Sequence, residues 1–306
     1  MWNGKRYHSL DYYLKETFGE KLYKLSLDGG MTCPNRDGKI SYGGCIFCSQ
    51  EGSGDFAAKF SGDIDKQIED AKSVISEKFS GRRYIAYFQS YTNTYAPLQY
   101  LKDLYYSVAE REDIAVLDIA TRPDCLSDDV IELIADLSSR KPVWVELGLQ
   151  TSDDETAALI NRGYKTEIYH KAVEKLHDAG VVVITHMIIG LPGEDISKML
   201  STAKHIADCG SDGIKLQLLH ILEGTKLAVM YRNGSAKALS EDEYIRILCE
   251  IIARLPPEMV IHRLTGDGDK RKLIAPLWSG DKKRILNRIN HELKLRNIVQ
   301  GCYLSR

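Results

Sequence analysis

Three cysteines near the N-terminus are spaced so that they could hold a metal together. Cys33, Cys45 and Cys48 follow the pattern C-x11-C-x2-C within DGGMTCPNRDGKISYGGCIFCSQEGSG. Thiolates are the usual protein ligands of iron–sulfur clusters, and three of them leave one iron of a four-iron cluster without a protein ligand. Structural zinc sites normally use four nitrogen or sulfur ligands. The spacing alone therefore allows a [4Fe-4S] cluster with an open iron, a zinc site, or no metal.

An open iron would give the first alternative a distinct chemistry. Such an iron could chelate the amino and carboxylate groups of S-adenosylmethionine (SAM). An electron from the cluster would then cleave the sulfonium and yield a 5′-deoxyadenosyl radical. Glycines flank the cysteines and would let the loop close around a bulky cofactor, or would form ordinary turns; they are Gly29, Gly30, Gly43 and Gly44.

The elements that must position these cysteines are predicted by apolar runs of strand length. Helical segments with 3.6-residue periodicity separate the runs, and such connections produce parallel strands. The order predicts a doubly wound sheet or an incomplete barrel. The predicted strands are 21–28, 83–90, 114–120, 142–150, 181–190 and 213–220, and the predicted helices include 64–79, 98–110, 128–137, 167–180 and 195–210.

Beyond residue 220 the pattern changes to a helix near 240–255, a strand at 258–264 and a basic helix at 281–299. No linker-like composition separates this part from the rest. We expect one compact unit with an N-terminal extension (1–20), a core (21–220) and a C-terminal extension (221–306) that packs on the core.

Composition and charge limit the class of protein. With 43% hydrophobic and 27% charged residues, the chain is typical of a globular protein. No apolar run is long enough to cross a membrane, and residues 1–20 lack a signal-peptide pattern, so we expect a cytoplasmic protein with no membrane partner. Seven cysteines, an odd number, favour reduced thiols. The net charge of −2 gives no overall nucleic-acid signature, yet residues 270–296 hold nine Lys or Arg against two acidic residues.

The cysteine loop and six further segments resemble the YhcC/YtqA family of Elp3-like radical SAM proteins. The resemblance covers nearly the whole chain. It implies a partial (β/α)6 TIM-like barrel with a C-terminal α/β extension, and a [4Fe-4S] cluster and SAM at the carboxyl ends of the strands. The further segments are ATRPDCL (120–126), VELGLQT (145–151), NRGY (161–164), HMIIGLPGE (186–194), LLHILEGTKL (218–227) and RLTGD (263–267).

The resemblance also implies positions for the SAM-binding residues. A clamp for the amino group usually follows the second strand, where this chain has Gln89, Ser90 and Asn93 without the common Gly-Gly-Glu. Arg162 resembles the family's clamp for the SAM carboxylate, a task that suits a guanidinium, although a salt bridge is the alternative. The segments at the adenine side would include His186, Gly190, Leu219 and His220.

Other residues near these segments have two interpretations each. Glu146 and Gln150 lie on one face of a strand, so both could point into the barrel and contact SAM or substrate. An unpaired carboxylate inside the barrel is costly, so Glu146 needs a ligand or a partner. Arg122 and Asp124 could pair with each other. Tyr164 stands where relatives often have His, and its role is open, as is that of Cys125. The remaining cysteines are interpreted as structural: Cys209, Cys249 and Cys302.

A tRNA substrate is the leading functional hypothesis. Elp3-like relatives include enzymes that modify wobble uridines in tRNA, and a flavodoxin or ferredoxin would supply electrons. On helix 281–299, Lys282, Lys283, Arg284, Arg288 and Lys294 could contact phosphates or form a solvated face. The alternatives are radical modification of a protein, peptide or small metabolite, and a non-catalytic zinc- or RNA-binding module.

Overall fold

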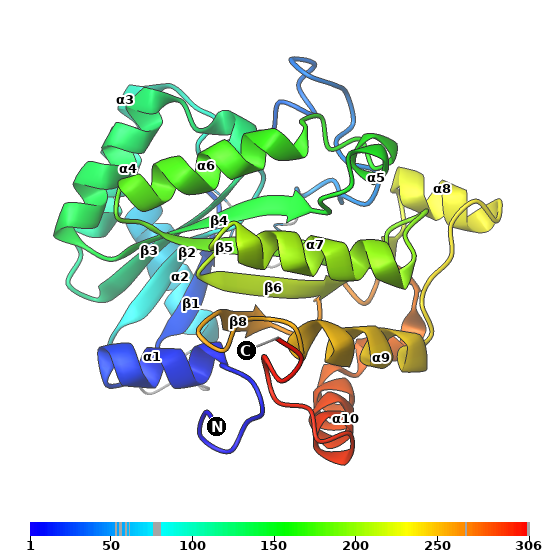
Figure 1. Ribbon diagram of the computed structural model, residues 1–306. Helices are drawn as coiled ribbons and strands as arrows, with labels where there is room; N and C mark the ends of the chain where they lie inside the picture. The colour runs from blue at the N-terminus through cyan, green and yellow to red at the C-terminus, as the bar shows by residue number, and fades with distance from the viewer. Residues whose placement is uncertain are drawn as a thin grey trace.

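Seven parallel strands lie side by side and curl into a half-barrel (Figure 1). The computed structural model describes residues 1–52, 54, 57–58, 60, 62–75, 81–266 and 268–304. Strand order follows chain order without a reversal, so the partial barrel is confirmed and the doubly wound alternative is wrong. The strands are β1 (Tyr23–Leu27), β2 (Tyr84–Phe88), β3 (Ile114–Thr121), β4 (Val143–Gln150), β5 (Val182–Ile189), β6 (Gly213–Leu218) and β8 (Val260–Arg263).

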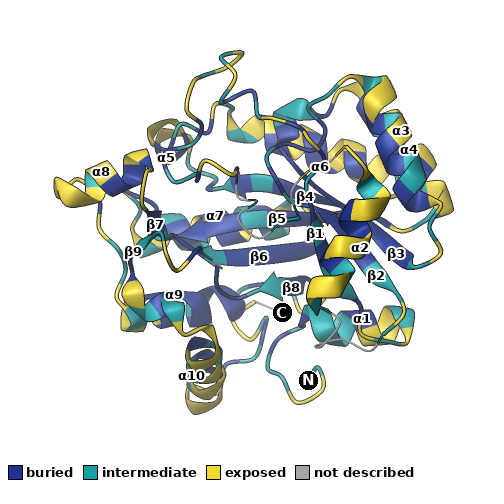
Figure 2. Cartoon of the chain, turned by 180° about the vertical axis from the view of Figure 1, so that it is seen from behind, coloured by how far each residue is buried: buried dark blue, intermediate teal, exposed yellow. Residues whose placement is uncertain are grey.

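Helices cover the outer face of the half-barrel, with buried residues on one side and exposed residues on the other (Figure 2). In α4, for example, Val130, Leu133, Ile134 and Leu137 are buried, a spacing of three to four residues that forms a single stripe. The helices are α1 (Leu10–Phe18), α2 (Ile64–Ile75), α3 (Leu98–Ala109), α4 (Asp128–Arg140), α5 (Asp154–Leu159), α6 (Thr166–Asp178), α7 (Ile196–Asp208), α8 (Lys226–Arg232), α9 (Glu241–Ile252) and α10 (Lys282–Leu295). The predicted continuation of α2 through residue 79 lies outside the described residues.

The strands are buried on both faces, as their nearly continuous apolar sequences predict. All eight residues of β3 are buried, because helices cover one side and the barrel interior the other. The interior also contains charged side chains, among them Asp118, Glu146 and Lys215, each less than 4% exposed. These polar groups are described with the site below.

The C-terminal extension contributes a strand to the half-barrel. β8 pairs with β6 in parallel, with Val260 opposite Gly213 and Ile261 opposite Ile214. A small antiparallel pair, β7 (Ile221–Leu222) and β9 (Leu273–Ala275), joins the extension to the end of β6. The predicted strand 258–264 is therefore the seventh strand of the sheet.

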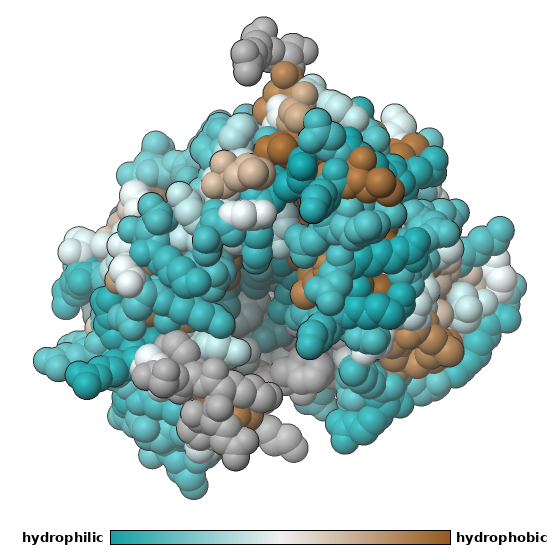
Figure 3. Space-filling view, turned by 90° about the horizontal axis from the view of Figure 1, so that it is seen from below, coloured by the Kyte–Doolittle hydropathy of each residue, from teal (hydrophilic) through white to brown (hydrophobic). Residues whose placement is uncertain are grey.

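The face of the molecule seen from below is mainly polar. Figure 3 shows one face of the molecule, on which hydrophilic side chains dominate and hydrophobic ones form small separate groups. None of the described helices has the length and apolar composition needed to cross a membrane.

Candidate functional site

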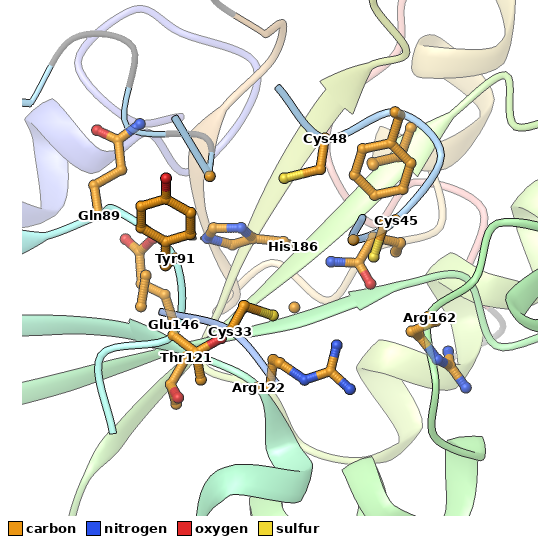
Figure 4. Close-up of a pocket in the computed structure, with 18 of the residues that line it drawn as sticks. Cys33, Cys45, Cys48, Gln89, Tyr91, Thr121, Arg122, Glu146, Arg162 and His186 are labelled. Carbon is orange, nitrogen blue, oxygen red and sulfur yellow. Dashed lines mark hydrogen bonds and ion pairs between the residues drawn. The ribbon is translucent and has the colours of Figure 1, made fainter. Parts of the chain in front are cut away.

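The three cysteines of the N-terminal loop line one pocket, which we call the central pocket. Cys33, Cys45 and Cys48 are free thiols and face a common space (Figure 4). The pocket lies at the carboxyl ends of the strands. Its lining includes Gln89, Tyr91, Thr121, Arg122, Glu146, Gln150, Arg162, Tyr164, His186, Lys215, Gln217 and Arg263.

Local turns hold the cysteine loop in this position. The amide of Arg36 donates to the carbonyl of Cys33 at 2.7 Å, and the amide of Cys48 donates to that of Cys45 at 3.0 Å. Gly44, just before Cys45, has a φ of 79°. A side chain there would be strained, and its Cβ would lie 3.0 Å from Arg36 Nε.

Two asparagines attach the loop to the segment that follows β4. Asn35 Nδ2 donates to the carbonyls of Asn161 (2.5 Å) and Arg162 (3.2 Å), and lies 3.7 Å from Cys45 Sγ. Asn161 Nδ2 donates in return to the carbonyl of Gly44 at 2.9 Å. The NRGY segment therefore supports the cysteine loop directly.

The donor set suits a cluster better than a single ion. Within the described ranges, the one group of three metal-ligating atoms that lie within 4.8 Å of one another is elsewhere in the fold, so the loop thiols are more widely spaced. Burial raises the pKa of Cys45 to about 12, and neighbouring Cys48 acts in the same direction. An ionised Cys45 therefore needs a positive partner, which a metal cluster provides.

Arg162 is buried (1% exposed) and its guanidinium is bound to protein acceptors. Nη1 donates to the carbonyls of Leu149 (3.0 Å) and Thr151 (2.6 Å), Nη2 to Tyr164 (2.9 Å), and an ion pair joins Nη2 to Asp154 (3.2 Å). To clamp a SAM carboxylate, as the sequence predicts, Arg162 would have to exchange some of these bonds. In this structure it fastens the end of β4 to the start of α6.

Arg122 is a second guanidinium beside the thiols. It pairs with Asp124 through two bonds of 2.9 and 2.7 Å, so the predicted pair is confirmed. Tyr164 lies between the two guanidinium groups, 4.3 Å from that of Arg162 and 5.1 Å from that of Arg122. Its hydroxyl donates to the carbonyl of Gly148, and burial raises its pKa. At neutral pH Tyr164 is therefore a packed phenol.

Charged and polar side chains from strands β1 to β6 form what we call the barrel-interior network. Glu146 is its hub, because it accepts from Lys24 (2.7 Å), from Lys215, and lies 2.7 Å from His186 Nε2. Asp118 also accepts from Lys24, and Lys215 donates to Tyr87 at 3.1 Å. The network comprises Lys24, Tyr87, Asp118, Glu146, His186 and Lys215. The partners that Glu146 was expected to need are thus two lysines and an imidazole.

Burial shifts the pKa values in this network in opposite directions. It raises the pKa of Asp118 to about 7, with repulsion from Glu146 adding to the effect. It lowers the pKa of Lys215 to about 7 and also lowers that of His186. For Glu146, burial acts upward, but Lys215 and Lys24 hold the pKa well below its usual range. Glu146 therefore stays ionised in the barrel.

The predicted SAM-binding residues divide into two groups. Gln89, Glu146, Gln150, Arg162 and His186 line the central pocket with the cysteines. Five others do not line it. Asn93 donates to the carbonyls of Phe88 and Ala120, Leu219 packs in a hydrophobic cluster, and Gly190 (φ 95°) lies against Leu239; the remaining two are Ser90 and His220.

Sequence reasoning missed Lys24, Tyr87, Asp118 and Lys215 as part of the site. A signal was present, since Lys24, Asp118 and Lys215 are single charges inside apolar strand runs. Arg263, from RLTGD, also lines the pocket, whereas Asp267 of that segment lies outside the described residues.

The basic helix α10 is partly neutralised by α9. Arg284 donates to Glu241 at 2.9 and 2.7 Å, and Arg288 pairs with Glu241 at 2.5 Å and with Asp242. Both arginines therefore take part in ion pairs within the chain. Phosphate contact by α10 stays a prediction.

Comparison with known proteins indicates the class to which such a pocket belongs. Residues 33–206 match the family described as Radical SAM superfamily, and residues 211–295 match the Radical_SAM C-terminal domain. Uncharacterized protein YtqA of Bacillus subtilis (strain 168) is 47% identical over 302 residues, covering 99% of this chain and 94% of YtqA.

Two further similarities are more distant. The tRNA uridine(34) acetyltransferase of Methanocaldococcus jannaschii is 32% identical over 162 residues, 52% of this chain and 29% of that protein. The solved structure of archaeal Methanocaldococcus infernus Elp3, with an N-terminal deletion, superposes with a TM-score of 0.69 at 19% identity, covering 91% of this chain and 64% of that one. The similarity to the Elp3 structure shows a shared fold.

Proposed function

Because the chain belongs to the radical SAM superfamily, in the family of YtqA and YhcC, we propose that Cys33, Cys45 and Cys48 hold a [4Fe-4S] cluster at which SAM binds. When bound, the cluster and SAM supply a 5′-deoxyadenosyl radical for hydrogen abstraction. Three free thiols from one loop face one pocket at the carboxyl ends of the strands, and this convergence supports the proposal most directly.

The walls of the central pocket provide groups that can bind and orient SAM. Gln89 and Gln150 offer amides, and the amide end of Gln150 lies 2.9 Å from the carbonyl oxygens of Gly148 and Leu149. Arg122 is bound through a single carboxylate and is therefore better able than Arg162 to meet the SAM carboxylate. The Glu146–His186 pair fixes the ring of His186 at the inner end of the pocket.

The substrate we propose is a wobble uridine of tRNA, whose side chain would be modified. Similarity to the tRNA uridine(34) acetyltransferase over 52% of the chain supports this choice. Since the match covers only 29% of that protein, acetyl transfer is not part of the proposal. The cations of residues 270–296 are compatible with RNA phosphates. A flavodoxin or ferredoxin as electron donor and a cytoplasmic location complete the proposal.

Two measurements test the two levels of this proposal. For the radical chemistry, reconstituted protein is mixed anaerobically with SAM and a reductant, and 5′-deoxyadenosine is quantified. We expect its formation by the wild type and by Cys302→Ser, and at least a 100-fold loss in Cys45→Ala, since a cluster without one of three thiolates is not retained.

For the substrate, tRNA nucleosides are compared by mass spectrometry between a strain that lacks the gene and the same strain complemented with wild type or Cys45→Ala. Accumulation of an unconverted wobble uridine in the deletion and in the Cys45→Ala strain supports tRNA. Identical nucleoside profiles in all strains would exclude tRNA while leaving the radical chemistry intact, and the substrate would then be a protein, peptide or metabolite.

A further inference from the structure

A second group of metal-ligating side chains lies on the outer helical layer, away from the central pocket. Among the residues that the structure describes, His170, His205 and Cys209 are the one set of three ligand atoms within 4.8 Å of one another. We propose that they form a zinc site that joins α6 to α7.

The backbone brings the three residues together. His205 lies in the last turn of α7, and Cys209 follows it by four residues as the C-cap of the same helix. The amide of Cys209 donates to the carbonyl of His205 at 3.0 Å, so both side chains emerge on one face. His170 comes from the neighbouring helix α6, and its ring stacks on that of His205 with centroids 5.3 Å apart and planes at 28°.

One atom of this group points to a ligand. Nε2 of His205 is buried and has no hydrogen-bond partner in the described chain. A buried polar atom without a partner is costly, and a metal ion would satisfy it.

The donor set selects the metal. Two imidazoles and a thiolate are typical zinc ligands, whereas magnesium and calcium prefer oxygen. Zinc binds nitrogen at about 2.0 Å and sulfur at about 2.3 Å, which separates tetrahedral ligand atoms by roughly 3.5 Å. Ligand atoms within 4.8 Å of one another therefore need to approach by no more than roughly 1.5 Å. Exposed His170 can make this movement. On binding, Cys209 loses its thiol proton to solvent, and the fourth position is left for water.

The test uses the full chain with its cluster installed anaerobically, so that the cluster cysteines cannot take up zinc. The protein is incubated with zinc chloride, dialysed against a weak chelator, and its zinc content is measured by mass spectrometry. We expect about one zinc per chain in the wild type. His170→Ala, His205→Gln and Cys209→Ser should retain at least fivefold less, while the matched controls His291→Ala and Cys302→Ser should retain the wild-type amount.

X-ray absorption at the zinc edge identifies the ligands. The proposal predicts a mixed nitrogen and sulfur shell with a single sulfur at about 2.3 Å. A shell dominated by sulfur would mean that zinc occupies the cluster loop, and would overturn the proposal. So would a wild type that retains no zinc, or a His170→Ala variant that retains as much zinc as the wild type. Because His170 is exposed, misfolding does not account for a loss of zinc in His170→Ala.

Discussion

At the scale of single residues, the central pocket is shaped by groups that are charged yet buried. Glu146 is fully buried and joins Lys24, Lys215 and His186, while Arg162 has its donors bound to backbone carbonyls. Removing one member of a buried ion pair leaves the remaining charge without a partner. This lowers the stability of the fold more than the loss of a surface ion pair does. The site and the stability of the barrel therefore depend on the same side chains.

Glu146→Gln should destabilise the protein by about 3–5 kcal/mol, because three cationic or hydrogen-bonding partners lose their carboxylate in the barrel interior. Urea unfolding followed by circular dichroism measures the change. Glu132→Gln, on the exposed face of α4, is the matched control and should lie within about 0.5 kcal/mol of the wild type. Equal unfolding midpoints for the two variants would contradict the role of Glu146 as hub.

Glu194 gives a prediction about pH. Burial raises its pKa to about 7, Thr151 donates to one of its oxygens at 2.5 Å, and the other oxygen is buried without a partner. A carboxyl group whose pKa is higher in the folded than in the unfolded state stabilises the fold while it is protonated. Its contribution to the free energy of unfolding is therefore lost as pH rises from about 4.5 to about 7. Each pKa unit corresponds to about 1.4 kcal/mol, and partial solvation of the carboxyl reduces the total to about 1–2 kcal/mol.

Glu194→Gln should therefore lack this loss. The unfolding free energies of the two proteins, measured between pH 4.5 and 8, should diverge. As pH rises, the variant should become more stable relative to the wild type. Glu174→Gln, an exposed residue of α6, should follow the wild type. Parallel curves for the wild type and Glu194→Gln would show that Glu194 titrates normally.

At the scale of elements, the cysteine loop depends on the segment after β4. Asn35 and Asn161 exchange hydrogen bonds between the two, and Arg162 fixes that segment to the end of β4. Sequence motifs that are distant in the chain thus form one support. The position of NRGY between β4 and α6 could be predicted from the alternation of strands and helices. Its contact with Asn35 could not, because periodicity does not specify loop-to-loop contacts.

Asn35→Ala should weaken the hold on the cluster without unfolding the barrel. The variant loses the bonds to Asn161 and Arg162, so we expect the iron content after anaerobic gel filtration to fall at least threefold. Asn290→Ala is the control and should keep its iron, because the side-chain amide of Asn290 donates to the carbonyl of Leu286 within α10. Undiminished iron in Asn35→Ala would mean that the loop holds its shape without this support.

At the scale of the whole molecule, the half-barrel was predictable because six apolar runs and their helices recur in order. The seventh strand, β8, was predicted as a strand but not as a partner of β6, since nothing in VIHR specifies its neighbour. The thiols were predictable from their spacing. Lys24, Asp118 and Lys215 were not recognised as one network, because only the curvature of the half-barrel brings strands β1, β3 and β6 around Glu146.

The distribution of charge leads to a prediction about RNA. Glu241 binds Arg284 and Arg288, whereas Lys283 and Lys294 of α10 are exposed. If α10 contacts tRNA, the double variant Lys283→Ala/Lys294→Ala should bind tRNA more weakly. The slope of log affinity against log salt concentration should become shallower by about 1–2, because each lost phosphate contact contributes up to about 0.9. Filter binding between 50 and 200 mM salt measures this. The control Lys171→Ala/Lys204→Ala changes exposed lysines of α6 and α7, and an identical loss there would indicate nonspecific attraction.

The most direct test of the central claim is electron paramagnetic resonance of the reduced, anaerobically reconstituted protein, with and without SAM. If Cys33, Cys45 and Cys48 hold a [4Fe-4S] cluster with an open iron, the protein will contain about four irons per chain, and SAM will change the g values of the reduced cluster. Loss of the signal in Cys33→Ala, with retention in Cys302→Ser, would assign it to the loop. A spectrum that SAM leaves unchanged, or zinc in place of iron at these cysteines, would contradict the account.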